Sequence, residues 1–203
     1  ASKPVMEGKG ILFKKFADID AVPVVLATQD VDEIVKTVKI IAPAFGGINL
    51  EDISAPRCFK IEERLKKELP IPVMHDDQHG TAIIILAGLL NALKVVGKNL
   101  AKVRIVISGA GAAGTAITKI LLKEGARHIL VCDSKGIIVS SRKNLSREKK
   151  ELAKLTNQEK IIGNLAQAMR GADVFIGVSG PGIVSEAMVR NMAKNSIVFA
   201  LAN

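Results

Sequence analysis

The sequence predicts an α/β protein built on a doubly wound parallel sheet, preceded by part of a smaller α/β domain. Short β-branched runs alternate with amphipathic helical stretches, which is the pattern of parallel strands covered by helices. A complete glycine fingerprint, GAGAAG at residues 109–114, lies between a predicted strand and a predicted helix and indicates a Rossmann-type sheet. We expect the smaller domain at residues 1–76, incomplete at its N-terminus, and the Rossmann-type domain at residues 77–203, incomplete at its C-terminus.

Local signals predict the elements of the first domain. A helix is expected over residues 32–41, because acidic residues at positions 30, 32 and 33 stand where a helix favours negative charge. Pro56 marks the start of the next helix, which continues over residues 59–69. Strands are expected at residues 22–26, 47–50 and 72–74.

The second domain opens with a long helix at residues 81–96 that is apolar on nearly every side, which we interpret as a buried connector between the two halves. A further helix is expected at residues 116–123, directly after the glycine turn. The strands of this domain are expected at residues 103–107, 128–132, 173–178 and 196–201.

Composition excludes several classes of protein. A hydrophobic fraction of 48% and a mean hydropathy of +0.28 indicate a folded globular chain. The net charge of +9 does not indicate nucleic-acid binding, because the lysines are spread along helical faces and only 3% of residues are aromatic. Apolar runs such as TAIIILAGLLNAL are too short to cross a bilayer, so we expect a cytoplasmic protein without a membrane segment. Cys58 and Cys132 lack a partner spacing and are expected to be reduced thiols.

Two pairs of adjacent carboxylates come after predicted strands. Glu51 and Asp52 come after one strand, and Asp76 and Asp77 come after the next. Ligands of open α/β sheets gather at the carboxyl ends of the strands, and several carboxylates in one place need a cation to hold them. A hard divalent metal is one interpretation. Helix capping, with each pair at the start of a helix, is an equally good one from spacing alone.

The glycine fingerprint indicates dinucleotide binding. Gly109 allows the tight turn, Gly111 lets the backbone approach the pyrophosphate, and Gly114 permits close packing of helix and strand. Asp133 comes 19 positions after Gly114, at the end of the second strand, where an acid accepts hydrogen bonds from the ribose of NAD and repels the 2′-phosphate of NADP. NAD is therefore the expected cofactor and NADP the alternative, since bases at positions 135, 142 and 143 either receive a phosphate or form a solvated loop.

Two later loops are expected to face the cofactor. Ser179 and Gly180 come after one predicted strand, and Asn203 comes after the last. Small residues let a nicotinamide ribose lie close to the backbone, and an asparagine side chain both donates and accepts hydrogen bonds. Ordinary turn chemistry is the alternative for Ser179.

Several blocks of the sequence resemble malic enzyme, above all the compact bacterial and archaeal forms. The two most specific blocks are GGINLEDISAPRCF and HDDQHGTA, which contain the acid pairs. The resemblance spans essentially the whole chain. It extends over PVMEGKGILFKKFADIDAVPV, SGAGAAG, VCDSKG, FIGVSGPG and FALAN.

The resemblance implies oxidative decarboxylation of L-malate to pyruvate and CO2, with NAD or NADP as oxidant and Mg²⁺ or Mn²⁺ as metal. By similarity Glu51, Asp52 and Asp77 are the metal ligands, Lys9 is the general base, and Asp76 is the acid beside it. It further implies a homodimer or larger homo-oligomer, a tyrosine general acid before Ala1 and a second asparagine loop after Asn203, so that the 203 residues alone are expected to bind cofactor with little turnover.

The predicted site residues are thus of four kinds, of which the metal ligands Glu51, Asp52 and Asp77 are one. Lys9 and Asp76 are catalytic, and Lys9 and Asn203 contact substrate. The cofactor-binding residues are Gly109, Gly111, Ala112, Ala113, Gly114, Asp133, Ser134, Ser179, Gly180 and Asn203.

Two alternative functions remain open from the sequence. An amino-acid dehydrogenase of the glutamate or leucine type also pairs a lysine-bearing substrate domain with a Rossmann domain, but it needs no metal. A non-catalytic module would bind NAD without reacting. Metal dependence and malate turnover distinguish these alternatives.

Overall fold

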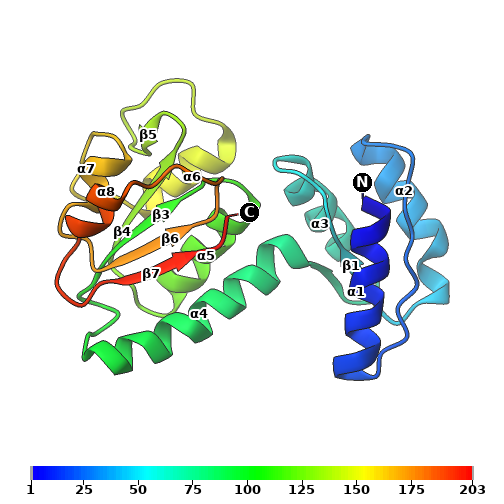
Figure 1. The fold of residues 1–203 in the computed structure, drawn as a ribbon. Coiled ribbons are helices and arrows are strands. Elements are labelled where there is room, and N and C mark those ends of the chain that lie inside the picture. The colour runs from blue at the N-terminus through cyan, green and yellow to red at the C-terminus, as the bar shows by residue number, and fades with distance from the viewer. Residues whose placement is uncertain (1, 203) are drawn as a thin grey trace. The chain divides into compact units, whose positions relative to one another are not determined.

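The computed structural model describes residues 2–202. The chain divides into two compact units, Ala1–Asp77 and Gln78–Asn203. The division therefore falls one residue after the boundary expected from the sequence. Figure 1 shows the helices and strands of each unit.

Unit 1 is built round a parallel pair of short strands. Leu50 of the first strand pairs with His75 of the second. The apolar core of this unit joins one face of a helix, through Ile34, Val35 and Val38, to Ile61 and Leu65 of another helix. Its elements are α1 (Ser2–Ala17), α2 (Val31–Ile41), the 3-10 turn η1 (Ala42–Ala44), β1 (Ile48–Leu50), α3 (Arg57–Glu68) and β2 (Val73–His75).

Helix α2 begins where its acids predicted. The Asp30 side chain caps it by accepting hydrogen bonds from the backbone N–H groups of Asp32 and Glu33. The strand expected at residues 22–26 is wrong, because this segment is extended without ladder hydrogen bonds. Pro23 has no N–H group to donate to a ladder, so β-branched composition alone did not decide this element.

Helix α4 (Asp76–Val96) begins five residues earlier than expected, because it takes Asp76 and Asp77 into its first turn. Ile85, Leu89 and Leu93 pack into the core of unit 2, whereas Ile83 and Ile84 are 54% and 69% exposed. The interpretation of a connector buried on all sides is therefore wrong. Its 21 residues also make α4 the one described helix whose length and composition alone would permit a membrane span, which is weak evidence because soluble core helices pass the same test.

Unit 2 contains a five-stranded sheet in the order β5-β4-β3-β6-β7. Four strands are parallel and β5 is antiparallel to β4. The direction of chain order reverses between β3 and β6, which is the switch point where doubly wound sheets bind ligands. The elements after α4 are β3 (Arg104–Ser108), α5 (Ala112–Lys123), β4 (His128–Asp133), β5 (Gly136–Ile137), α6 (Arg147–Leu155), α7 (Leu165–Met169), β6 (Val174–Gly177), α8 (Glu186–Arg190) and β7 (Ile197–Ala200).

Both faces of this sheet are covered. Ile105 and Ile107 of β3 belong to the core cluster that contains α4, α5 and α6 residues, and Val106 belongs to the cluster beneath α7. Alternate side chains of a strand point to opposite faces, so this division confirms a doubly wound parallel sheet. Figure 1 shows the helices on either side of the strands. The sequence interpretation did not include β5, α6, α7 or α8.

Candidate functional site

The structure brings both acid pairs to one edge of unit 1. Strands β1 and β2 run parallel and in register, so the residues that come after each strand emerge side by side. The backbone N–H of Asp52 donates to Oδ2 of Asp77 at 2.9 Å, which joins the two loops directly. Asp52 has a left-handed backbone, with φ of 56°. The acid pairs therefore share one site.

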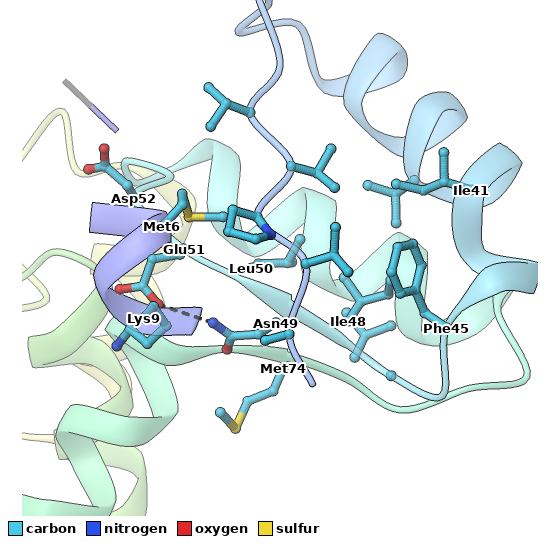
Figure 2. A pocket seen from close by; sticks show the side chains of 18 of the residues that line it. Met6, Lys9, Ile41, Phe45, Ile48, Asn49, Leu50, Glu51, Asp52 and Met74 are labelled. Carbon is cyan, nitrogen blue, oxygen red and sulfur yellow. Dashed lines mark hydrogen bonds and ion pairs between the residues drawn. The ribbon is translucent and has the colours of Figure 1, made fainter. Parts of the chain in front are cut away.

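Lys9 reaches this site from α1. Its Nζ lies 2.6 Å from Oδ2 of Asp76 and 3.3 Å from Oε2 of Glu51. Figure 2 shows Lys9 beside Glu51, with Asn49 bonded to the same carboxylate. Burial lowers the pKa of Lys9, but the hydrogen bond and charge of Asp76, together with Glu51, raise it above its ordinary value. Lys9 is therefore an ammonium ion in this arrangement.

The carboxylates of the site differ in their environments. The side chain of Glu51 is only 7% exposed, and burial, together with the charges of Asp76 and Asp77, raises its pKa. The pKa of Asp77 is lowered, first by the His75 side chain and then by the N–H of Asp52, against the effect of burial. Lys9 contacts Glu51 and Asp76, and the nearby acids Asp52 and Asp77 leave an excess of negative charge at this edge.

The donor chemistry of this site fits a divalent metal. Carboxylate oxygens are the ligands that Mg²⁺ and Mn²⁺ prefer, and the neighbouring charges that raise the Glu51 pKa are those a cation would relieve. Within residues 2–202, no three His, Cys, Asp or Glu side chains are gathered closely enough to hold an ion as they stand. The residues therefore supply the right oxygens from adjacent loops.

The structure agrees with the helix-capping interpretation at one acid pair and not at the other. The residue at the N-terminal cap of α3 is Pro56, which makes no side-chain capping bond, so Asp52 does not cap that helix. Asp76 and Asp77 lie in the first turn of α4, where negative charge is favourable. Capping accounts for one pair only.

The dinucleotide fingerprint has the geometry that its spacing predicted. A Cβ on Gly114 would lie 1.7 Å from the carbonyl oxygen of Gly109, and Gly109 itself has φ of +125°. A Cβ on Gly111 would meet nothing within 4 Å, which leaves open space above the turn. Helix α5 begins at Ala112, and Gly111 at its cap offers no side chain, so the backbone N–H groups of the first turn, including Ala113, remain for an anion.

Asp133 at the end of β4 is held by two cations. Arg142 donates to both carboxylate oxygens, and Nζ of Lys149 lies 2.6 Å from Oδ2. The backbone N–H of Lys135 donates to Oδ1. Burial raises the pKa of Asp133, but these donors outweigh burial and hold it at about 2.

This ion cluster alters the expected cofactor preference. The carboxylate that was expected to bind ribose and repel a 2′-phosphate already accepts from Arg142, Lys149 and a backbone N–H. Of the other bases considered, Lys143 is exposed, and Ser134 next to Asp133 is exposed as well. Arg142 and Lys149 thus give the neighbourhood of Asp133 a net positive charge, which reduces the repulsion that this carboxylate exerts on a phosphate.

The remaining predicted contacts lie in later loops. Oγ of Ser179 lies 3.1 Å from Oγ of Ser108, which places the loop after β6 against the end of β3, with Gly180 next along the chain. Asn203 lies outside the described residues.

Three neighbours of the site residues were missed from the sequence. Asn49 donates to Glu51, His75 lies against Asp77, and Lys149 binds Asp133. The first two stand two positions before a predicted ligand. Lys149 belongs to a helix that was not predicted.

Unit 2 has a doubly wound sheet with a helix after the glycine turn, and unit 1 carries a site of lysine and carboxylates. This combination is typical of dinucleotide-dependent enzymes. Residues 78–203 match the family model described as malic enzyme, NAD binding domain, and residues 1–66 match malic enzyme, N-terminal domain. The chain belongs to the malic enzyme family.

Curated relatives and solved structures agree with this assignment. The chain is 57% identical to the bifunctional malic/malolactic enzyme of Bacillus subtilis (strain 168), with all of this chain and 50% of that protein aligned. It is 58% identical to the NAD-dependent malic enzyme of Geobacillus stearothermophilus, over all of this chain and 42% of the relative. The crystal structure of NAD-dependent malic enzyme from Thermotoga maritima matches with a TM-score of 0.96 at 46% identity, over 100% of this chain and 54% of that one. The chain thus spans about half the length of these relatives.

Proposed function

We propose that this chain is the part of a malic enzyme that binds malate, a divalent metal and NAD(P), and that it takes part in oxidative decarboxylation of L-malate to pyruvate and CO2. The observation that carries the proposal is the meeting of Lys9 with both acid pairs in unit 1. The amino-acid dehydrogenase alternative gives no role to four clustered carboxylates.

In the proposed reaction Lys9 exchanges a proton with the C2 hydroxyl of malate. As the O–H bond breaks, hydride leaves C2 for the nicotinamide and a C2 carbonyl forms. The bond between C3 and the C4 carboxylate then breaks, its electron pair moves toward the C2 oxygen, and protonation of C3 gives pyruvate. Asp76 accepts a hydrogen bond from the Lys9 ammonium at 2.6 Å and so fixes the position of the amine.

Glu51, Asp52 and Asp77 are the residues that would hold Mg²⁺ or Mn²⁺. When bound, such an ion acts as a Lewis acid that polarises the C2 oxygen and stabilises the enolate. The acids also set the state of Lys9, because Asp76 and Glu51 raise its pKa in the arrangement described. Its role as a base therefore requires that the negative charge around it be offset when the site is loaded.

For the cofactor, we propose that the chain uses NAD and discriminates only weakly against NADP. The identity of 58% to an NAD-dependent relative supports NAD. The cluster of Arg142 and Lys149 on Asp133 supports weak discrimination, because the net local charge is positive and attracts a 2′-phosphate. A homodimeric or larger assembly and a cytoplasmic location complete the proposal.

The test is reduction of NAD and NADP by the purified protein with malate and Mn²⁺, in parallel assays with and without a chelator. Reduction that needs malate and stops with the chelator supports the proposal. Reduction with glutamate or leucine that resists the chelator would establish the dehydrogenase alternative. Cofactor binding that neither malate nor metal affects, with no reduction, would favour the non-catalytic module.

A further inference from the structure

Two proposed metal ligands in unit 1 have the same local arrangement. Each has a polar side chain two positions earlier in the sequence, and that side chain faces its carboxylate. Nδ2 of Asn49 donates to Oε2 of Glu51 at 3.1 Å. Nε2 of His75 lies 3.4 Å from Oδ2 of Asp77. Because β1 and β2 pair in register, the two arrangements lie on neighbouring strands.

Asn49 is placed to act on Glu51 and on little else. It lies in the middle of β1, and on a strand residues two apart point to the same face. Its amide N donates to Glu51, whereas its Oδ1 is buried with no hydrogen-bond partner among the described residues. A half-buried amide with one unpaired end costs stability, so the donor bond to Glu51 is the contact by which Asn49 acts in this site.

His75 is the second positioning side chain. It is the last residue of β2 and is 0% exposed, whereas the side chain of its neighbour Asp77 is 44% exposed. A buried imidazole against a half-exposed carboxylate restricts the rotation of that carboxylate.

Polar neighbours contact one oxygen of each carboxylate. Asn49 and Lys9 both reach Oε2 of Glu51, and His75 and the Asp52 N–H both reach Oδ2 of Asp77. Among the contacts described for residues 2–202, the second oxygens, Oε1 and Oδ1, are the ones left for a cation. Fixing one oxygen in this way orients the other.

We propose that Asn49 and His75 are positioning residues that hold Glu51 and Asp77 for a divalent cation. The inference rests on the proposed function, since it takes these acids to be metal ligands. The partners that orient metal ligands contribute to metal affinity without touching the ion, and their loss typically weakens binding by about 10-fold to 100-fold. Asn49 and His75 are expected to contribute on this scale.

The test is titration of Mn²⁺ into the purified protein, monitored by electron paramagnetic resonance of free Mn²⁺, which needs no turnover. Asn49→Leu and His75→Leu remove the donors at similar size and should each weaken Mn²⁺ binding by about 10-fold to 100-fold. His75→Gln keeps a donor near the position of Nε2 and should recover much of the loss. Met74→Leu, at the position paired with Asn49 and directly before His75, is the matched control and should bind as the unaltered protein does.

Thermal unfolding and NAD binding accompany each titration, because His75 is buried and its loss can disturb unit 1. If His75→Leu does not fold, Asn49→Leu, at a half-buried position, carries the test. Normal Mn²⁺ affinity in a folded Asn49→Leu variant would overturn the positioning role and leave the proposed function intact. Absence of Mn²⁺ binding in the unaltered protein would overturn both proposals.

Discussion

The two polar sites of the chain have opposite charge balances. In unit 1 the ammonium of Lys9 pairs with Glu51 and Asp76, and the backbone N–H of Asp52 joins the adjacent acid Asp77 to the same edge. In unit 2 the single carboxylate of Asp133 is held by Arg142 and Lys149. The first site has a net negative charge, which favours binding of a cation. The second has a net positive charge, which favours binding of the phosphates of a dinucleotide. Charge balance therefore separates the proposed metal site from the cofactor site more clearly than residue type does.

The largest expected effect comes from removing the Lys9 cation from the acid-rich site. In a malic enzyme that contains this chain together with the expected tyrosine segment, Lys9→Met should lower kcat for malate by about 10²-fold to 10⁴-fold, the usual contribution of a positioned proton-transfer group. NAD affinity should not change, because the fingerprint lies in the other unit. Steady-state kinetics and NAD titration measure the two effects. Lys14→Met, on the same helix but 56% exposed, is the control, and equal losses in both variants would show that Lys9 has no special role.

Substitutions of Gly114 and Gly111 test the proposed phosphate site separately for stability and for cofactor binding. Gly114→Ala should destabilise the protein by about 3 kcal/mol or more, because its Cβ would lie 1.7 Å from the carbonyl oxygen of Gly109. Gly111→Ala should fold normally, since nothing lies within 4 Å of its added Cβ, yet bind the cofactor less well. Denaturant unfolding and NAD titration separate the two. Unchanged cofactor binding in Gly111→Ala would mean that the pyrophosphate does not approach this backbone.

Acid should remove the contribution of Asp133 to stability. Its pKa is about 2 in the folded chain against an ordinary 3.8, so the ion cluster stabilises the fold fully above about pH 4 and progressively less toward pH 2. Asp133→Asn should therefore lower the free energy of unfolding by about 2 kcal/mol at pH 7. The difference from the unaltered protein should shrink as the pH falls through this window. A difference that stays constant down to pH 2 would show that the cluster does not stabilise the fold.

The smallest effect concerns cofactor choice. Arg142→Gln leaves Asp133 with less positive charge around it, so NADP should lose about tenfold in kcat/KM relative to NAD. Lys143→Gln, at an exposed neighbouring position, should leave the ratio unchanged. A shift toward NADP in Arg142→Gln would contradict the electrostatic account.

Much of this organisation could be predicted from the sequence for physical reasons. The GAGAAG turn fixes its own geometry through Gly109 and Gly114, and short β-branched runs reveal strands buried on both faces. The acid pairs could be placed together because parallel strands in register bring the residues after them to one edge. Asp30 likewise marked the start of α2 by side-chain capping.

The interpretations that failed depended on contacts between distant side chains. The ribose role of Asp133 stays a prediction, but the sequence did not indicate its partner Lys149, which reaches it from the unpredicted helix α6. The segment at residues 22–26 has strand composition without a ladder partner. A local sequence pattern predicts a helix or strand. The tertiary contacts of that element determine which of its side chains and backbone groups have partners.

The central claim is that the acid-rich site of unit 1 binds a divalent cation. Calorimetric titration of Mn²⁺ into the unaltered protein, Asp77→Asn and Asp133→Asn tests this claim directly. We predict one Mn²⁺ site in the unaltered protein, lost in Asp77→Asn and retained in Asp133→Asn. Mn²⁺ binding that survives in Asp77→Asn, or that Asp133→Asn abolishes equally, would contradict the assignment of the metal to this site.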